Sequence, residues 1–287
     1  MTIVDSGPEV HLRSWFNDPY NDAISAARTC YSSRVIDPNE VTEEQRKNIG
    51  PLTFEGGHHT VYQHAPFDFG LPGISRQLVW AFLHGFTYYN TEQQSQRYVQ
   101  LDEITAHVPP ILQGREREIF CASIERSWRA YRELTERLTP VTQRILSDLW
   151  RLPARKSTAF GKSIAREAEK RAIETARYVI PIACHTAMIY TVSGIVLHRL
   201  RRMIRVGDVP REAAEVVGPL IAAVERADAT FFERIGGPPR EFEEVVDGPI
   251  APPGVGDAAR ADSYDHACHG TRLLLLYYMM RAPLRTS

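Results

Sequence analysis

The chain has 287 residues, a length that allows one large domain or two small ones. Hydrophobic residues make up 43% and charged residues 24%, which is ordinary for a globular protein and excludes a disordered chain. The 34 Lys and Arg balance 35 Asp and Glu, which also excludes a protein that binds nucleic acid or membranes through its overall charge. A local basic patch is compatible with this balance.

Cysteine usage and the first residues predict a cytoplasmic protein. The four cysteines lie far apart with no CxxC pair, so neither a disulfide framework nor a zinc ribbon is expected. Residues 1–9 contain two acidic side chains and lack the apolar core of a signal peptide. Residues 178–197 form an uncharged run about as long as a membrane span, but Pro181 and several hydroxyl side chains favour a buried helix that carries functional polar groups.

The first third of the chain predicts short helices around one strand. Residues 22–31 have the pattern of a short helix. Alternating phenylalanine and aspartate predict a strand over residues 61–69 with one buried face. The glycines of residues 70–73 should end this strand, and the apolar residues 74–86 should form a buried helix.

The rest of the chain predicts long helices. Residues 115–138 form the clearest amphipathic pattern, with apolar side chains at three- and four-residue spacing, and Pro140 predicts its end or a short break. Residues 163–177 and 213–235 predict two more helices, the second ended by Gly236. Helices should therefore dominate the fold.

Three stretches could bind an anion. Ser95 and Arg97 lie near a predicted junction of loop and helix, where a hydroxyl, a backbone N–H and a guanidinium could together bind a phosphate. The alternative is a polar surface loop. Arg177 directly precedes an apolar segment, where an arginine needs a partner, and a ligand anion is one candidate. Four arginines among residues 199–205 point in several directions, so they form either a solvated face or part of an interface.

Several segments, in this order, resemble motifs of the flavin-dependent thymidylate synthases. They are AAR at residues 26–28, GHHTVYQH at 57–64, GISR at 73–76, QQSQRY at 93–98, and ARYVIP at 176–181 followed by TVS at 191–193. The corresponding family patterns are AAR, GHxTxxEH, GVSR, QQSQRY, and ARxxLP followed by TxN and LR. Their common order and similar spacing extend the resemblance over residues 26–235.

The resemblance implies three groups of site residues and no metal site. The residues implied to bind the nucleotide are Gln93, Ser95, Gln96, Arg97 and Arg177. Those implied to bind the cofactor are His58, Thr60, Gln63, His84, Glu92, Ser193 and Arg199. The catalytic arginine that reads the base is assigned to Arg201 and Arg205, with Arg202 as a further candidate for the same position.

The chain departs from the family pattern on the flavin side. Where the family has HQLVRHR, residues 80–86 read WAFLHGF, in which only His84 is basic, and the following loop is about one residue longer. The glutamate of GHxTxxEH is Gln63 here, and the asparagine of TxN is Ser193. The motif residues implied to bind the substrate phosphate therefore match the family pattern, whereas those implied to hold the flavin differ from it.

The resemblance further implies an α+β fold, in which a mixed or antiparallel sheet packs with long helices and helices prevail. Residues 1–240 would be the catalytic domain, and residues 241–287 a loop and a C-terminal helical extension. Family members are typically homotetramers whose flavin and nucleotide sites are shared between subunits, and the same assembly is expected here.

The implied reaction transfers a one-carbon unit from methylene-tetrahydrofolate to carbon 5 of a uracil nucleotide, with FAD as the hydride source and NADPH as its reductant. The altered loop favours a branch of the family that methylates UMP as well as dUMP in nucleoside-antibiotic pathways, because a ribose hydroxyl needs room and a polar partner. One alternative is a nucleotide-binding regulatory protein that kept the fold but lost flavin chemistry. Another is a different flavin-dependent transfer to a uridine derivative.

Overall fold

A computed structural model describes residues 3–85, 89–150, 158–206 and 211–235. The chain divides into two compact units. Unit 1 consists of residues 1–7, 72–76 and 93–188, and unit 2 of residues 8–71, 77–92 and 189–287. The predicted extension at residues 241–287 lies outside the described ranges.

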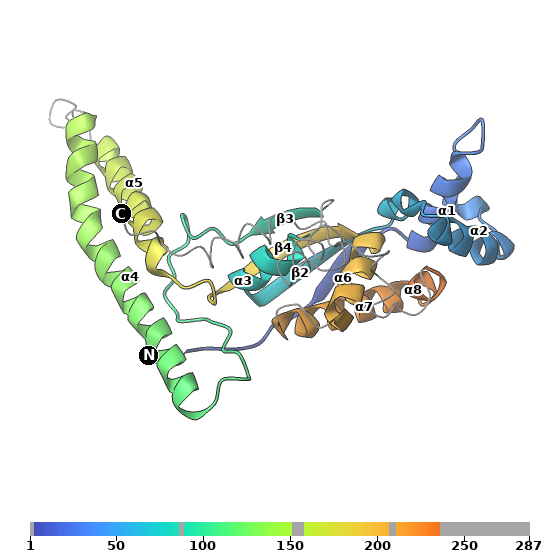
Figure 1. Ribbon diagram of the computed structural model, residues 1–287. Coiled ribbons are helices and arrows are strands. Elements are labelled where there is room, and N and C mark those ends of the chain that lie inside the picture. Colours follow the sequence, from blue (N-terminus) through green and yellow to red (C-terminus); the bar gives the residue numbers. More distant parts are fainter. Residues whose placement is uncertain (1–2, 86–88, 151–157, 207–210, 236–287) are drawn as a thin grey trace, which may run out of the picture. The chain divides into compact units, whose positions relative to one another are not determined.

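One four-stranded antiparallel sheet confirms the predicted α+β class (Figure 1). Its strands are β1 (His11–Trp15), β2 (Pro66–Ser75), β3 (Tyr89–Gln93) and β4 (His185–Ser193), in the spatial order β1-β2-β4-β3. β1 pairs with β2 so that Leu12 lies opposite Phe69 and Trp15 opposite Phe67. The two phenylalanines are fully buried, as their alternation with Asp68 predicted.

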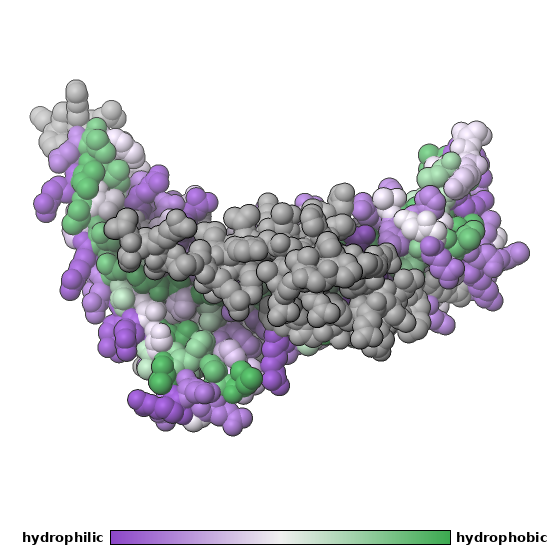
Figure 2. All heavy atoms as spheres, in the orientation of Figure 1, coloured by the Kyte–Doolittle hydropathy of each residue, from purple (hydrophilic) through white to green (hydrophobic). Residues whose placement is uncertain are grey.

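Unit 1 is built on a helical hairpin. Helix α4 (Gly114–Leu149) lies beside α5 (Thr158–Ala176), which continues into the short 3₁₀ helix η5 (Arg177–Val179) (Figure 1). Figure 2 shows hydrophobic side chains on the exposed surface of this hairpin. The predicted end or break at Pro140 is wrong, because α4 continues through it. A proline inside a helix costs roughly 3 kcal/mol, which the long packing contact with α5 offsets.

Unit 2 combines two groups of short helices. The first contains α1 (Pro19–Thr29), η1 (Pro38–Glu40), α2 (Glu43–Glu55) and the 3₁₀ helix η2 (His59–His64). The second contains α6 (Gly194–Val206), α7 (Arg211–Ala227) and α8 (Phe231–Arg234). The short α3 (Arg76–Leu78) and the π-helical turn η3 (Val79–Leu83) follow β2.

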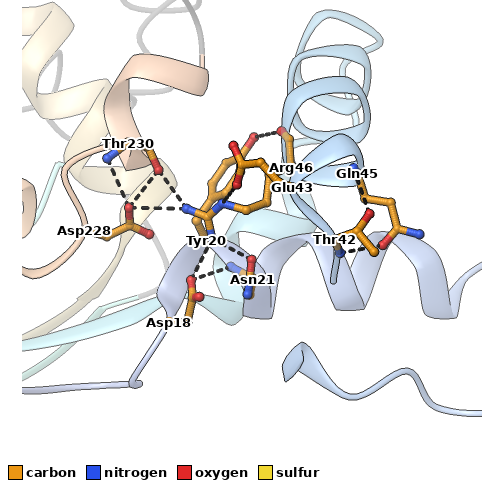
Figure 3. A network of polar contacts seen from close by, with 9 residues as sticks. All are labelled: Asp18, Tyr20, Asn21, Thr42, Glu43, Gln45, Arg46, Asp228 and Thr230. Atoms are coloured by element: carbon orange, nitrogen blue, oxygen red, sulfur yellow. Dashed lines mark hydrogen bonds and ion pairs between the residues drawn. The ribbon is translucent and has the colours of Figure 1, made fainter. Parts of the chain in front are cut away.

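An arginine network joins the two groups of helices in unit 2 (Figure 3). Nη1 of Arg46, on α2, donates to Oδ1 of Asp18 at 3.0 Å and to Oδ1 of Asn21 at 2.6 Å. Its Nη2 donates to Oγ1 of Thr230 at 2.7 Å and lies 3.6 Å from Oδ1 of Asp228. Asp18 caps the N-terminus of α1, Asp228 follows the end of α7, and Thr230 precedes α8. The guanidinium of Arg46 therefore links three helix ends.

Three sequence predictions need correction before β4. Residues 61–64 belong to η2 rather than to the strand, which begins at residue 66. The glycines of residues 70–73 do not end β2, which continues to Ser75, with Gly73 at a φ of 74°. A positive φ is open to glycine, so the strand can pass through Gly73 without ending there. The helix expected at residues 74–86 is therefore reduced to α3 and η3.

The uncharged run at residues 178–197 is not one buried helix. It contains most of η5, all of β4 and the first turn of α6. In β4, Met188, Tyr190 and Val192 are buried while the residues between them are more exposed, which is the period of a strand. Apolar side chains occur on both faces of β4, so the hydropathy of the sequence does not show this alternation of buried and exposed residues.

The helix predicted at residues 213–235 is interrupted. α7 ends at Ala227, and Asp228 accepts hydrogen bonds from the backbone and the hydroxyl of Thr230 before α8 begins. Among the described ranges, no helix has the length and apolar character needed to span a membrane.

Candidate functional site

Ser95 and Arg97 lie on one tight turn after β3. Oγ of Ser95 accepts a hydrogen bond from the backbone N of Arg97 at 3.2 Å. The backbone N of Val99 donates to the carbonyl of Ser95 at 3.1 Å. The backbone N of Gln94 donates to the carbonyl of Ala187 at 2.9 Å, which anchors the start of the turn. A hydroxyl and a guanidinium are thereby held two residues apart on a fixed backbone.

The end of α5 brings a second arginine to this turn. Oε1 of Glu174 lies 3.8 Å from Nη1 of Arg97, whose side chain is 52% exposed. The backbone carbonyl of the same Glu174 accepts a hydrogen bond from Nε of Arg177 at 3.2 Å. The QQSQRY and ARYVIP segments, which are about 80 residues apart in the sequence, thus both contact Glu174, one through its carboxylate and the other through its backbone carbonyl.

Arg76 of the GISR segment is a third arginine here, and the sequence interpretation gave it no role in the site. Its Nη1 donates to Oε1 of Gln93 at 3.1 Å, and its Nη2 donates to the carbonyl of Gln94. Its Nε is buried and has no partner among the described residues. Burial lowers the pKa of Arg76; the neighbouring Cys184 opposes this in part, and the positive charge of Arg177 adds to it. Arg76 is the one arginine of the mostly apolar residues 74–86, and a charged side chain in such a segment is the sequence signal that could have pointed to it.

We name Arg76, Ser95, Arg97 and Arg177 the arginine cluster. The two glutamines predicted to bind the nucleotide, Gln93 and Gln96, make hydrogen bonds within the protein next to this cluster. Gln93 accepts from Arg76, and Nε2 of Gln96 donates to Sγ of the buried Cys184 at 3.4 Å. Burial raises the pKa of Cys184, so this thiol is protonated at neutral pH and is a poor nucleophile.

Unit 2 contains a cavity of about 270 Å³ that brings together two predicted cofactor residues, Gln63 and Ser193. It is lined by Gln63, Pro66, Tyr89, Asn90, Thr191, Val192 and Ser193, and we name it the Ser193 cavity. None of these side chains is charged. Ser193 is 5% exposed, and its hydroxyl has no partner among the described residues. Sequence reasoning missed Tyr89, Asn90 and Thr191, although Thr191 lies in the TVS segment.

An aromatic stack adjoins this cavity through Tyr89. The ring of His84 stacks on that of Tyr89, with centroids 4.6 Å apart and planes within 9°, and Trp80 packs edge-on against His84. Nε2 of His84 lies 3.3 Å from Oγ1 of Thr91, which fixes the imidazole. A neutral cavity with an unpartnered hydroxyl and an aromatic wall fits the planar heterocycle of a flavin.

A second cavity in unit 2, of about 660 Å³, contains His58. Its lining includes Arg28 from the AAR segment and His58 from the GHHTVYQH segment. The other lining residues are Ala27, Tyr31, Ser32, Ile36, Ile49, Leu52, Thr53 and Gly56. These two motif segments therefore also meet in space, at a cavity that is lined differently from the Ser193 cavity.

The predicted arginines of α6 differ in their environments. Nη1 of Arg201 lies 3.9 Å from Oε1 of Glu225 on α7, and its guanidinium lies over the ring of Phe232. Arg199 is half-buried, and its charge helps to lower the pKa of the buried His198. The side chain of Arg205 lies outside the described part of the structure.

Two further predicted residues, Thr60 on η2 and Glu92 on β3, are exposed and line neither cavity. Within the described residues, no group of three or more His, Cys, Asp or Glu side chains is placed to hold a metal ion.

Comparison with known proteins relates this chain to a family. Residues 11–226 match the family model described as thymidylate synthase complementing protein. A flavin-dependent thymidylate synthase of Clostridium tetani is 28% identical over 235 residues, which cover 80% of this chain and 87% of that protein. The corresponding enzyme of Mycobacterium sp. (strain JLS) is 31% identical over 168 residues, covering 58% of this chain and 60% of that protein.

A solved structure shares the fold. The crystal structure of PolB, a UMP/dUMP methylase from Streptomyces cacaoi bound with 5-Br dUMP, aligns with a TM-score of 0.55 at 15% identity, covering 82% of this chain and 96% of that one. The family match spans three quarters of the sequence, and the flavin side of the motif pattern is altered. The chain therefore belongs to the thymidylate synthase complementing protein family, as a divergent enzyme of the flavin-dependent thymidylate synthase type.

Proposed function

We propose that the protein methylates carbon 5 of a uracil nucleotide, UMP or dUMP, with FAD as its flavin. Methylene-tetrahydrofolate would donate the carbon, and NADPH would reduce the flavin. The arginine cluster carries this proposal, because it gathers a hydroxyl and guanidinium groups suited to binding a phosphate in a chain that belongs to a thymidylate synthase family. We also propose that residues 1–240 form the catalytic domain of a cytoplasmic homotetramer, with sites shared between subunits.

The arginine cluster would hold the nucleotide by its phosphate. The cluster contains three arginines, and the printed ion pair within it is the one between Arg97 and Glu174, so positive charge is in excess there. A phosphate can accept from the Ser95 hydroxyl and from the arginine side chains at once. The buried Nε of Arg76 lacks a partner, which an anion would supply directly or through water.

The Ser193 cavity and the aromatic stack would position the planar ring of a bound ligand for the reaction. A bound reduced flavin would supply the hydride that completes the methyl group. The uncharged lining of the cavity would orient a planar ring by hydrogen bonds and keep water from it. Arg201 and Arg205 remain our candidates for reading the base, where a guanidinium would stabilise developing negative charge on the pyrimidine. The protonated Cys184 thiol has no role as a nucleophile in this scheme.

Turnover by the purified full chain tests the proposal. The protein would be reconstituted with FAD and incubated with NADPH, methylene-tetrahydrofolate and either UMP or dUMP, and the 5-methylated nucleotide would be measured. We expect methylation of both, which would agree with a role in nucleoside-antibiotic biosynthesis. Turnover of dUMP alone would overturn the ribonucleotide part, and no turnover of either would overturn the proposed function.

Flavin binding separates the enzyme from the alternative, a nucleotide-binding regulatory protein without flavin chemistry. Loss of the family's arginines at residues 80–86 favours that alternative. The absorbance of the reconstituted protein at about 450 nm decides between them. A protein that binds dUMP but cannot be loaded with FAD would support the regulatory protein.

Nucleotide affinity tests the arginine cluster itself. Arg97→Ala and Arg177→Ala should each weaken dUMP binding about tenfold or more in calorimetry, because each removes a charge-assisted contact to phosphate. Arg171→Ala is the matched control, since Arg171 also contacts Glu174 but lies outside the cluster. Unchanged affinity in both cluster variants would refute the assignment.

A further inference from the structure

Cys184 lies where three motif segments of unit 1 meet. The backbone N of Arg76 donates to the carbonyl of Cys184 at 3.0 Å. Nε2 of Gln96 donates to Sγ of the same residue at 3.4 Å. The backbone N of Cys184 donates in turn to the carbonyl of Pro181 at 3.0 Å. One residue therefore contacts the GISR, QQSQRY and ARYVIP segments.

Apolar packing fixes the position of this cysteine. Cys184 is 1% exposed and belongs to a core cluster whose other buried members are Ile104, Ala106, Ile124 and Trp128. Ala106 also pairs with it in an antiparallel β-bridge. A side chain packed on all sides has little freedom to move. The longer, half-buried side chains that reach Cys184 therefore take their position from it.

A neutral thiol suits this place. Burial raises the pKa of Cys184, and the neighbouring Arg76 and Gln96 oppose this only in part, so the thiol is protonated at neutral pH. A carboxylate in the same position would pair with Arg76 and compete with a phosphate for it. A thiol is an uncharged acceptor, so it takes a hydrogen bond without removing positive charge from the arginine cluster.

Arg76 and Gln96 each keep a donor for a ligand while they contact Cys184. Nε of Arg76 is buried and has no partner among the described residues. The amide nitrogen of Gln96 carries two N–H groups, and the sulfur accepts one of them. A phosphate could accept from both side chains without breaking either contact with the cysteine.

We propose that Cys184 is a positioning residue of the nucleotide site. Its carbonyl holds the backbone of Arg76 and its thiol holds the amide of Gln96, so that a phosphate meets both side chains already oriented. The inference rests on the proposed function and deepens it. It adds a residue that does not touch the nucleotide and acts through two residues that do.

The affinity of the full chain for dUMP tests the inference. Cys184→Ala removes the sulfur acceptor and should weaken dUMP binding about three- to fivefold in calorimetry. Cys184→Ser keeps an acceptor near the same position and should recover most of the lost affinity. Cys121→Ala alters another free cysteine of unit 1, on α4, and is the matched control that should bind dUMP like the unaltered protein.

A double-mutant cycle separates positioning from a general loss of structure. If the thiol acts through Gln96, Cys184→Ala should weaken dUMP binding no further once Gln96→Ala is present. A cysteine that only supports the core would weaken binding equally in both backgrounds.

The S–H group gives a readout that leaves Cys184 unaltered. In a variant with Cys30→Ser, Cys121→Ser and Cys268→Ser, Cys184 carries the one thiol of the chain, and its S–H stretching band can be followed by Raman spectroscopy. Addition of dUMP should shift this band, because a phosphate on the Gln96 amide polarises the hydrogen bond that the sulfur accepts. The phosphate-free 2′-deoxyuridine should leave the band in place.

Three results would each overturn the inference: dUMP affinity unchanged in Cys184→Ala, a loss that is the same with and without Gln96, or an S–H band that dUMP does not move. If Cys184→Ala does not fold, the band decides. Any of these results together with nucleotide methylation by the unaltered protein overturns this inference alone. A Gln96-dependent loss of affinity without any methylation would instead overturn the proposed function and leave the role of Cys184 standing.

Discussion

If the arginine cluster binds a phosphate as we propose, the carboxylate of Glu174 should compete with that phosphate for Arg97. This carboxylate lies 3.8 Å from Arg97, and the backbone of Glu174 accepts from Arg177. Removing the charge in Glu174→Gln leaves the helix and the backbone bond in place. The variant should bind dUMP about two- to fivefold more tightly, which is the range expected for a partly exposed ion pair.

Glu167→Gln is the control for this prediction. Glu167 pairs with the same Arg171 on the same helix, and it has no ion pair with Arg97 among the described contacts. It should leave dUMP affinity unchanged in the same calorimetric titration. Equal gains in both variants would show a general charge effect of α5 rather than competition at the cluster.

His198 should make the protein less stable in acid. Burial, followed by the charges of Arg202 and Arg201, lowers the pKa of His198 to about 3. Between that value and about 6.5 the unfolded chain binds a proton that the folded chain does not. The free energy of unfolding should therefore fall by about 1.4 kcal/mol per pH unit as the pH drops through this window, and be fully regained above it.

Urea denaturation at pH 7, 6 and 5 measures this slope. His198→Leu should make it shallower without abolishing it, because burial also lowers the pKa of His59. His11→Leu alters an exposed histidine on β1 and serves as the control. A slope identical in the unaltered protein and in His198→Leu would contradict the prediction.

At the scale of elements, the Arg46 network should be a main stabilising contact of unit 2 (Figure 3). Arg46→Ala leaves the Asp228 carboxylate, whose side chain is 8% exposed, without its cation. Breaking a buried pair on one side should lower the free energy of unfolding by about 3 kcal/mol. Arg34→Ala removes a solvent-exposed pair with Glu40 and should have a much smaller effect in the same urea titration.

The start of α6 depends on a glycine for a packing reason. A Cβ at Gly194 would lie 2.2 Å from Cζ of Phe231, a fully buried ring on α8. Gly194→Ala should therefore destabilise the protein by about 2 kcal/mol, through overpacking. The loss should shrink in a Phe231→Leu background, where the ring is absent.

Gly161→Ala is the opposite case. A Cβ at Gly161, on α5, meets no atom within 4 Å, so alanine should stabilise by about 0.5 to 1 kcal/mol through backbone entropy. Thermal melts of the single and double variants compare the two glycines. A destabilising Gly161→Ala would show that helix propensity does not explain the difference.

At the scale of the whole molecule, the exposed apolar side of α4 bears on assembly. Val141, Ile145 and Leu149 repeat at four-residue spacing and are all exposed. If a second copy covers this stripe, light scattering after gel filtration should give the mass of four chains, and Ile145→Glu with Leu149→Glu should reduce it. A monomeric unaltered protein would contradict the proposed tetramer.

The sequence by itself determined what depends on neighbouring residues. The amphipathic pattern of residues 115–138 predicted most of α4, and the charged pattern of residues 163–177 predicted α5, because helix formation follows local periodicity. The segments containing Ser95 and Arg97 were recognised because motif letters and spacing lie in the chain itself. Family membership followed from the same letters.

Tertiary structure alone decided what depends on residues far apart in the chain. The strand at residues 185–193 was expected to be helical because apolar residues occur on both of its faces, and only pairing with neighbouring strands determines its conformation. Arg76 meets Arg177, and Tyr89 meets Ser193, across about one hundred residues. Hydropathy and spacing report contacts along the chain, whereas a site is made where the folded backbone brings distant side chains within hydrogen-bond reach.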